Sequence, residues 1–264
     1  MNLRCDCRSV FRSSILLCSL LASTCTAADL DIIFAGDFTN SQPIQWVRRH
    51  PRAGGASIAL GPAYVTATRL SGGGGVNLTM YLQVPPELNG NGDYPLWSAL
   101  KTFGPSSGGV PAIGDCVSAE GTIINFNGAS ELNGAVWTGT PGECGDAAIA
   151  PYVPLLVSAV ATDADPNTAG NQPGASAESL ESVLVRLNDL GVLTSNSGAG
   201  SFQIGDQASG AGVYLSVGGF LYQYTAVQGT LIASITGVLD EFDVAAPPET
   251  VYQLLPRSAA DIVD

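Results

Sequence analysis

Few side chains of this sequence could carry out chemistry on a substrate. Its 264 residues include one histidine, His50, which rules out a metal site built from several histidines. Ser106 lies in GPSSG (104–108), which has the G-x-S-x-G spacing of serine hydrolases, but that chemistry needs a strand–turn–helix context and a histidine later in the chain. Here the histidine comes earlier, and the Gly- and Pro-rich context predicts an ordinary turn. We therefore expect a protein that is not an enzyme.

Acidic side chains are more numerous, with 23 Asp and Glu against 10 Lys and Arg, a net charge of −13. Glycoside hydrolysis needs an acid and a base on facing elements, and no such spacing links the four glutamates that we considered: Glu120, Glu131, Glu143 and Glu178.

Calcium is the metal that the remaining acidic residues favour. The candidate calcium ligands are oxygen donors that alternate along the chain or lie together near the end of a strand: Asp163, Asp165, Asn167, Asp240 and Asp243. The first three do not form an EF-hand, because the sixth and twelfth positions hold Thr168 and Gly174 instead of Gly and Glu. We expect no cofactor, with calcium at these residues as the alternative to solvated acidic loops.

Binding is the other activity that the residue types permit. The segment 46–52 combines an aromatic ring with a basic cluster, and exposed aromatic rings elsewhere could stack on a ligand. The candidate binding residues are Trp46, Arg48, Arg49, Tyr81, Trp97, Tyr214 and Tyr222. The alternatives are a solvated loop for the basic cluster and core positions for half or more of the rings. Because the negative charge repels phosphate backbones, we do not expect tight sequence-independent binding of nucleic acid.

Short strands must position these residues, because helical periodicity is nearly absent. Seven apolar or alternating runs have strand length and are separated by turn residues: 63–70, 78–84, 116–126, 183–188, 201–204, 212–217 and 232–242. They repeat one plan twice: a strand, a strand with an aromatic residue, a short strand (96–100 in the first half), and a long strand broken by Gly121 or Gly237. A glycine bend in a long strand favours a small closed barrel, and the OB fold is such a barrel of five short strands. The sequence predicts an all-β protein of two OB-like β-barrel units in tandem.

The first residues have the pattern of an export signal. Three arginines precede a short apolar run, 15–22, and small residues follow it. The run is shorter than the roughly 20 residues of a membrane span, and no later stretch qualifies. We expect a secreted, extracellular or periplasmic protein without a membrane span; lipid attachment at Cys25 is the alternative.

Removal of the signal peptide changes the net charge and the number of cysteines. Cleavage after residue 27 removes three Arg and Asp6, which takes the net charge from −13 to −15. It also leaves Cys116 and Cys144 as the last two cysteines, and an even pair in an exported protein predicts a disulfide. The expected organisation is a signal peptide (1–27), an N-terminal segment (28–58), a first OB-like domain (59–150), an extension and linker (151–176) and a second OB-like domain (177–264).

The sequence resembles OB-like accessory domains of bacterial secreted nucleases. GDCVSAEGTIINFNGASEL (114–132) resembles their G-D-x-V-x-x-x-G-x-V-x-x-F-x-G-x-T-E-L run. In the second half, AESLESVLVRL (177–187), FQIGD (202–206), ITGVL (235–239) and YQLLPRSAADI (252–262) resemble the companion pattern, although Ser182 stands where that pattern prefers Gly. The resemblance covers about residues 60–264 and lacks the catalytic endonuclease/exonuclease/phosphatase-type domain that usually follows.

This resemblance implies a secreted, non-catalytic binding or accessory protein. Its expected partner is an extracellular polysaccharide, a protein, a nucleic acid or a separate nuclease. Two alternatives remain: an extracellular nuclease- or phosphodiesterase-related enzyme or a fragment of one, and a calcium-stabilised extracellular structural protein.

Overall fold

A computed structural model describes residues 44–49, 55–88, 94–145, 149–153, 157, 160, 177–197, 200–206, 214–244 and 249–264. Ser41–Asp264 form one compact unit. The expected signal peptide, Cys25, His50 and the acidic residues Asp163, Asp165 and Asn167 lie outside the described residues.

Five strands close the first barrel: β1 (Ala56–Ser71), β2 (Asn77–Gln83), β3 (Ala99–Pro105), β4 (Cys116–Phe126) and β5 (Ala129–Gly139). Their spatial order is β1-β2-β3-β5-β4, and β4 pairs with β1 to complete the ring. Every pair is antiparallel except β3–β5. The helix α2 (Ile44–Arg49) contributes Ile44 and Val47 to the core of this barrel.

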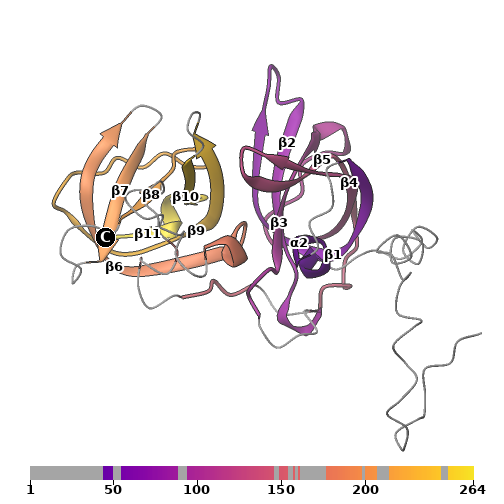
Figure 1. Ribbon diagram of the computed structural model, residues 1–264, viewed down its shortest axis with the longest axis horizontal. Helices are drawn as coiled ribbons and strands as arrows, with labels where there is room; N and C mark the ends of the chain where they lie inside the picture. Colours follow the sequence, from indigo (N-terminus) through magenta and orange to yellow (C-terminus); the bar gives the residue numbers. More distant parts are fainter. Residues whose placement is uncertain are drawn as a thin grey trace, which may run out of the picture. The chain divides into compact units, whose positions relative to one another are not determined.

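The second barrel contains β6 (Leu184–Ser197), β7 (Ser201–Asp206), β8 (Leu215–Val217), β9 (Leu231–Val244) and β10 (Glu249–Leu255), with β11 (Ile262–Val263) added to β9. The ring runs β6-β7-β8-β10-β9 and closes where β9 pairs with β6. Its parallel pair, β8–β10, corresponds to β3–β5 in the first barrel. The predicted fold is therefore confirmed: two small OB-like barrels follow each other with the same strand order (Figure 1).

The predicted glycine bends lie at equivalent places, in the fourth strand of each barrel. A Cβ added at Gly121 in β4 would lie 2.8 Å from the carbonyl oxygen of Asn133. At Gly237 in β9 it would lie 2.6 Å from the carbonyl oxygen of Leu255. Only glycine allows the neighbouring strand to approach so closely, so these residues allow the long strands to bend without losing their partners.

The sequence does not predict β5, and it places the third strand too early. In β5 buried and exposed residues do not alternate regularly, and its polar composition is that of a loop. Trp97, expected within a short strand at 96–100, lies in a turn with a φ of 63°, and β3 starts at Ala99. The pairing of β3 with β5 determines both that β5 forms and where β3 begins, and the local sequence does not contain such a tertiary contact.

The predicted disulfide is present. Cys116 at the start of β4 is bonded to Cys144 beyond β5, with a Cα–Cα distance of 5.8 Å. Short 3₁₀ turns connect other elements: η1 (Pro86–Leu88), η2 (Ser106–Gly108), η4 (Glu178–Leu180) and η5 (Ala259–Asp261). Among the helices described, none has both the length and the apolar composition that crossing a membrane requires.

Candidate functional site

The outer face of β1, β2, β3 and β5 carries two rows of polar and aromatic side chains. Along β2, Leu78, Met80 and Leu82 point into the core, so the alternating residues Thr79 and Tyr81 lie on the outside. One row pairs Arg69 with Thr79 and Thr79 with Phe103. The next row runs Ala67, Tyr81, Lys101 and Glu131. In OB folds the face of the second and third strands is the one that binds ligands.

Residues from the second half of the chain cover part of this face. Leu184, Val238 and Leu255 form a small buried cluster with Ala67 and Tyr81. The contact continues through polar groups, because the backbone N–H of Leu184 donates to Gln83 Oε1 at 3.0 Å. Arg257 Nη1 likewise donates to the carbonyl oxygen of Thr66 at 3.1 Å. The second row is thereby removed from water, while the first row keeps part of its exposure.

A buried ion pair lies at the centre of the covered face. Lys101 Nζ is 3.3 Å from Asp240 Oδ1 on β9, and the two residues are 8% and 3% exposed. Tyr81 donates its hydroxyl hydrogen to the same oxygen at 3.1 Å, and Gln253 Nε2 reaches Oδ2 at 3.5 Å. Burial raises the pKa of Asp240, although Lys101 opposes the rise. Burial raises the pKa of Tyr81 as well, so its hydroxyl remains a donor.

Beside this ion pair, a cavity of about 370 Å³ opens between the face and the second barrel. It is lined by Arg69, Ser71, Thr79, Lys101, Phe103, Phe126, Glu131, Phe220, Asp240 and Gln253. The guanidinium of Arg69 stacks on the ring of Phe220, with its Cζ 3.9 Å from the ring centroid. Phe126 is 50% exposed although it is aromatic. A volume in this range, aromatic walls and a few convergent polar groups are typical of small-molecule sites.

Two charged groups of this cavity remain available to a ligand. Within the described part of the chain, no hydrogen bond or ion pair engages the guanidinium of Arg69 or the carboxylate of Glu131. Burial raises the pKa of Glu131, Lys101 opposes that rise, and Asp240 adds to it. By contrast, Lys101 and Asp240 already satisfy each other.

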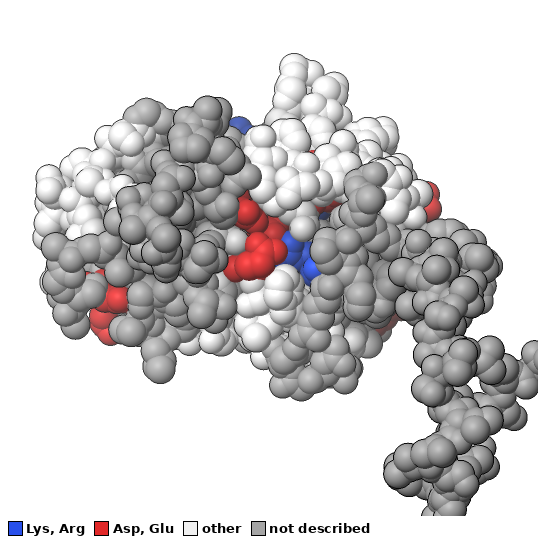
Figure 2. Space-filling model, in the orientation of Figure 1, with Lys and Arg blue, Asp and Glu red and all other residues white. Residues whose placement is uncertain are grey.

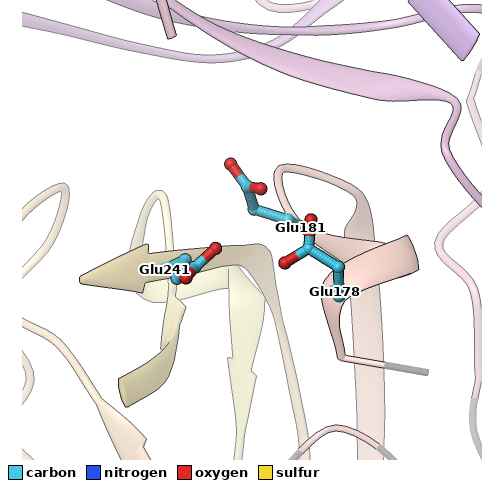
Figure 3. A group of neighbouring side chains, drawn as sticks. All are labelled: Glu178, Glu181 and Glu241. Carbon is cyan, nitrogen blue, oxygen red and sulfur yellow. The ribbon is translucent and has the colours of Figure 1, made fainter. Parts of the chain in front are cut away.

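A second group of carboxylates, Glu178, Glu181 and Glu241, brings one oxygen of each residue within 4.8 Å of the others (Figure 3). Arg48 from α2 forms ion pairs with both Glu178 and Glu181, and its Cζ lies 5.5 Å from the ring centroid of Trp97. Acidic side chains adjoin basic ones in the space-filling view as well (Figure 2).

The surroundings of the three carboxylates fit a structural ion-pair network better than a metal site. Burial raises the pKa of Glu181 to about 7, and Arg48 only partly offsets this. The backbone N–H of Ser130 donates to Glu181 Oε1 at 3.0 Å, and the Tyr252 hydroxyl donates to Glu178 Oε2 at 2.9 Å. A divalent cation would have to share the oxygens of Glu178 and Glu181 with the guanidinium of Arg48, which already forms ion pairs with both residues.

A larger cavity, of about 590 Å³, lies near the disulfide and includes Tyr64, Asp115 and Arg257 in its lining. The charge of Arg257 is already used, because Asp261 accepts hydrogen bonds from its Nη2 at 2.7 Å and its Nε at 2.9 Å. Asp115 accepts a hydrogen bond from the backbone N–H of Ala112. This cavity therefore offers fewer available charged groups than the one beside Lys101.

The candidate binding residues from the sequence are not gathered in one place. Arg48 is buried in the ion-pair network, and Tyr81 is fully buried beside Asp240. Trp97, Tyr214 and Tyr222 are half-buried, each in a different part of the chain. The side chains of Trp46 and Arg49 lie outside the described part of the structure.

The acidic candidates are likewise dispersed. Asp240 is paired with Lys101, and the side chain of Asp243 lies outside the description. Glu120 and Glu143 are exposed, whereas Glu131 and Glu178 belong to the two different groups described above. Ser106 begins η2, and its hydroxyl donates to the carbonyl oxygen of Gly75 at 2.6 Å, as in an ordinary turn.

Sequence reasoning did not single out Arg69, Lys101, Phe103 and Phe220. One signal was present: Lys101 is the only lysine of the sequence and lies within an otherwise apolar run. The other three become a group only when β1, β3 and the segment after β8 meet around one cavity.

The fold and this cavity define the class of protein: an all-β chain with two OB-like barrels and a charged, aromatic-lined cavity. No family model matches the chain, and no curated protein matches it. One similar solved structure is described as "Structural mimicry for functional antagonism", with 9% identity, a TM-score of 0.37, and coverage of 76% of this chain and 90% of the other. Another, "Molecular basis for abrogation of activation of pro-inflammatory cytokines", has 10% identity, a TM-score of 0.34, and coverage of 80% and 93%. At these TM-scores neither likeness carries an argument about function.

Proposed function

We propose that this protein is a secreted, non-catalytic binding protein that holds a small ligand in the cavity beside Lys101. The observation that carries the proposal is the cavity itself, with Arg69 and Glu131 available in its wall and aromatic rings around them. Its position on the outer face of β2 and β3 supports the proposal, because OB folds bind ligands there.

Secretion is supported by the apolar run at 15–22 and by the disulfide, a bond that persists in oxidising compartments. The resemblance to accessory domains of secreted nucleases agrees with a binding role. A long nucleic acid is a poor candidate for the ligand, because part of the face is covered and the sequence has a net charge of −13.

Thermal denaturation of the purified protein in the presence of a library of sugars, amino acids, short peptides and nucleosides tests this function. A ligand that binds the folded state raises the melting temperature. We expect at least one compound to do so, and the Arg69→Gln change to reduce the shift. Arg186→Gln is the matched control, because Arg186 is an exposed arginine of β6 outside the cavity lining.

Two results would contradict the proposal. One is a library in which no compound stabilises the protein. The other is a stabilising compound that acts equally on the wild type and on the Arg69→Gln variant. Metal-dependent turnover of DNA or RNA by the purified chain would favour a nuclease-related enzyme instead.

A further inference from the structure

The two available charges of the cavity have opposite signs, and they lie on different strands. Arg69 belongs to β1 and Glu131 to β5, with Thr79 and Phe103 on the strands between them. Three strand spacings of about 4.8 Å separate β1 from β5 across the face. Both side chains line the same cavity, so a ligand between them meets a cation at one end and an anion at the other.

Arg69 is prepared to bind a carboxylate. Its guanidinium stacks on Phe220, and stacking uses the flat face of the group while the N–H donors point outward along its edge. A carboxylate can accept two of these donors in parallel, which is the strongest geometry for this pair. The stack also fixes the orientation of the guanidinium before a ligand arrives, so less conformational freedom is lost on binding.

Glu131 is prepared to accept hydrogen bonds from a cation. The residue is 4% exposed and lies in register with Lys101, but the ammonium of Lys101 is already paired with Asp240. Burial disfavours the ionised form of Glu131, because the carboxylate loses its hydration. The ammonium of a ligand would replace part of that lost stabilisation.

The remaining wall suits an apolar body. Phe103, Phe126 and Phe220 contribute three rings, and Phe126 keeps half of its surface exposed. Contact with such rings favours an apolar or aromatic substituent.

The net charge of the protein further restricts the class of ligand. A polyanion would meet Glu131 and a protein of net charge −13, while a simple cation would meet Arg69. A zwitterion with no net charge satisfies both groups and meets no net repulsion.

We infer that the cavity binds a small zwitterion with an apolar body, of the size of a free amino acid or a dipeptide. Its carboxylate pairs with Arg69, its ammonium with Glu131, and its side chain contacts Phe103 and Phe126. This inference rests on the proposed binding function and names the chemistry of its ligand.

Isothermal titration of the full chain with four probes tests the inference: L-phenylalanine, the dipeptide Phe-Ala, N-acetyl-L-phenylalanine and L-phenylalaninamide. We expect saturable binding of at least one of the first two. Loss of the ammonium or of the carboxylate should weaken binding about 10- to 100-fold, since each removes a charge-assisted pair.

Two variants assign each end of the ligand to a residue. Arg69→Gln should abolish the preference for the free carboxylate over the amide, and Glu131→Gln should abolish the preference for the free amine over the acetylated form. Arg186→Gln should bind like the wild type. Melting temperatures without ligand confirm that each variant is folded.

The outcomes separate this inference from the proposed function. If a sugar or nucleoside binds in an Arg69-dependent way and no zwitterion does, the binding function stands and the inference is wrong. If the acetylated and amidated probes bind as tightly as L-phenylalanine, the inference is also wrong. If no probe and no library compound binds, both are wrong.

Discussion

Replacing Lys101 with methionine tests whether the buried ion pair holds the covered face together. Methionine keeps most of the length of the side chain but removes the ammonium that lies 3.3 Å from Asp240. Two buried carboxylates, Asp240 and Glu131, would then face the same space without the ammonium of Lys101 beside them. Removing one partner of a buried ion pair costs about 3–5 kcal/mol, a large part of the roughly 5–15 kcal/mol that stabilises a typical domain.

Urea denaturation at several pH values measures this cost. Burial already raises the pKa of Asp240 and of Glu131 in the wild type, and Lys101 opposes the rise in both. Without Lys101 both folded-state pKa values rise further. A carboxyl group whose pKa is raised on folding loses its contribution to stability as the pH rises through the folded value. The Lys101→Met change should therefore cost more at pH 8 than at pH 5.

Two further variants make the result interpretable. The exposed Glu120→Gln change is the control and should alter the free energy of unfolding by less than about 0.5 kcal/mol. Combining Lys101→Met with Asp240→Asn should recover most of the loss, because the Asn oxygen can still accept from Tyr81 without a buried charge. A cost below about 1 kcal/mol at pH 7, or one that does not change with pH, would refute the reasoning.

Three other predictions concern parts of the fold away from Lys101. Burial raises the pKa of Glu181 to about 7, so the wild type should lose about 3 kcal/mol of stability from this group between about pH 4.5 and 7. The urea midpoint of the Glu181→Gln variant should lack this decrease with pH, and an equal decrease in both proteins would contradict the prediction. The Gly237→Ala change should lower the free energy of unfolding by about 1–3 kcal/mol, since the added Cβ would lie 2.6 Å from a backbone carbonyl oxygen of β10. Gly139→Ala is the control, because a Cβ there has nothing within 4 Å, and equal urea midpoints for the two variants would contradict the explanation. Replacing both Cys116 and Cys144 by serine should lower the free energy of unfolding by about 3–4 kcal/mol, because the disulfide closes a loop with a sequence separation of 28. Unchanged thermal and urea midpoints would exclude such a contribution.

The sequence predicts the barrels because their main determinants are local. The alternating apolar residues of β2 and the glycines at 121 and 237 lie within single strands, and the same plan occurs twice. The missed strand β5 has a polar composition and depends on its parallel pairing with β3.

The candidate site was largely beyond prediction for a different physical reason. Tyr81 and Lys101 alternate with core residues, and such a pattern normally indicates a face turned toward water. Their burial depends on residues of the second barrel, among them Asp240, which is 139 positions from Lys101 along the chain. No local pattern contains that contact, so the pairing of Lys101 with Asp240 could be found only in three dimensions.

The buried position of Lys101 has a practical consequence, because it is the only lysine of the sequence. An amine-reactive label should find almost no side-chain target in the folded protein and should mark the α-amino group instead. A protease specific for lysine has one site, and that site lies in the middle of β3 under the residues of the second barrel. Acylation of Lys101 would therefore report the molecules in which this side chain has become exposed, whereas a cut beside it would report those in which β3 itself has unfolded.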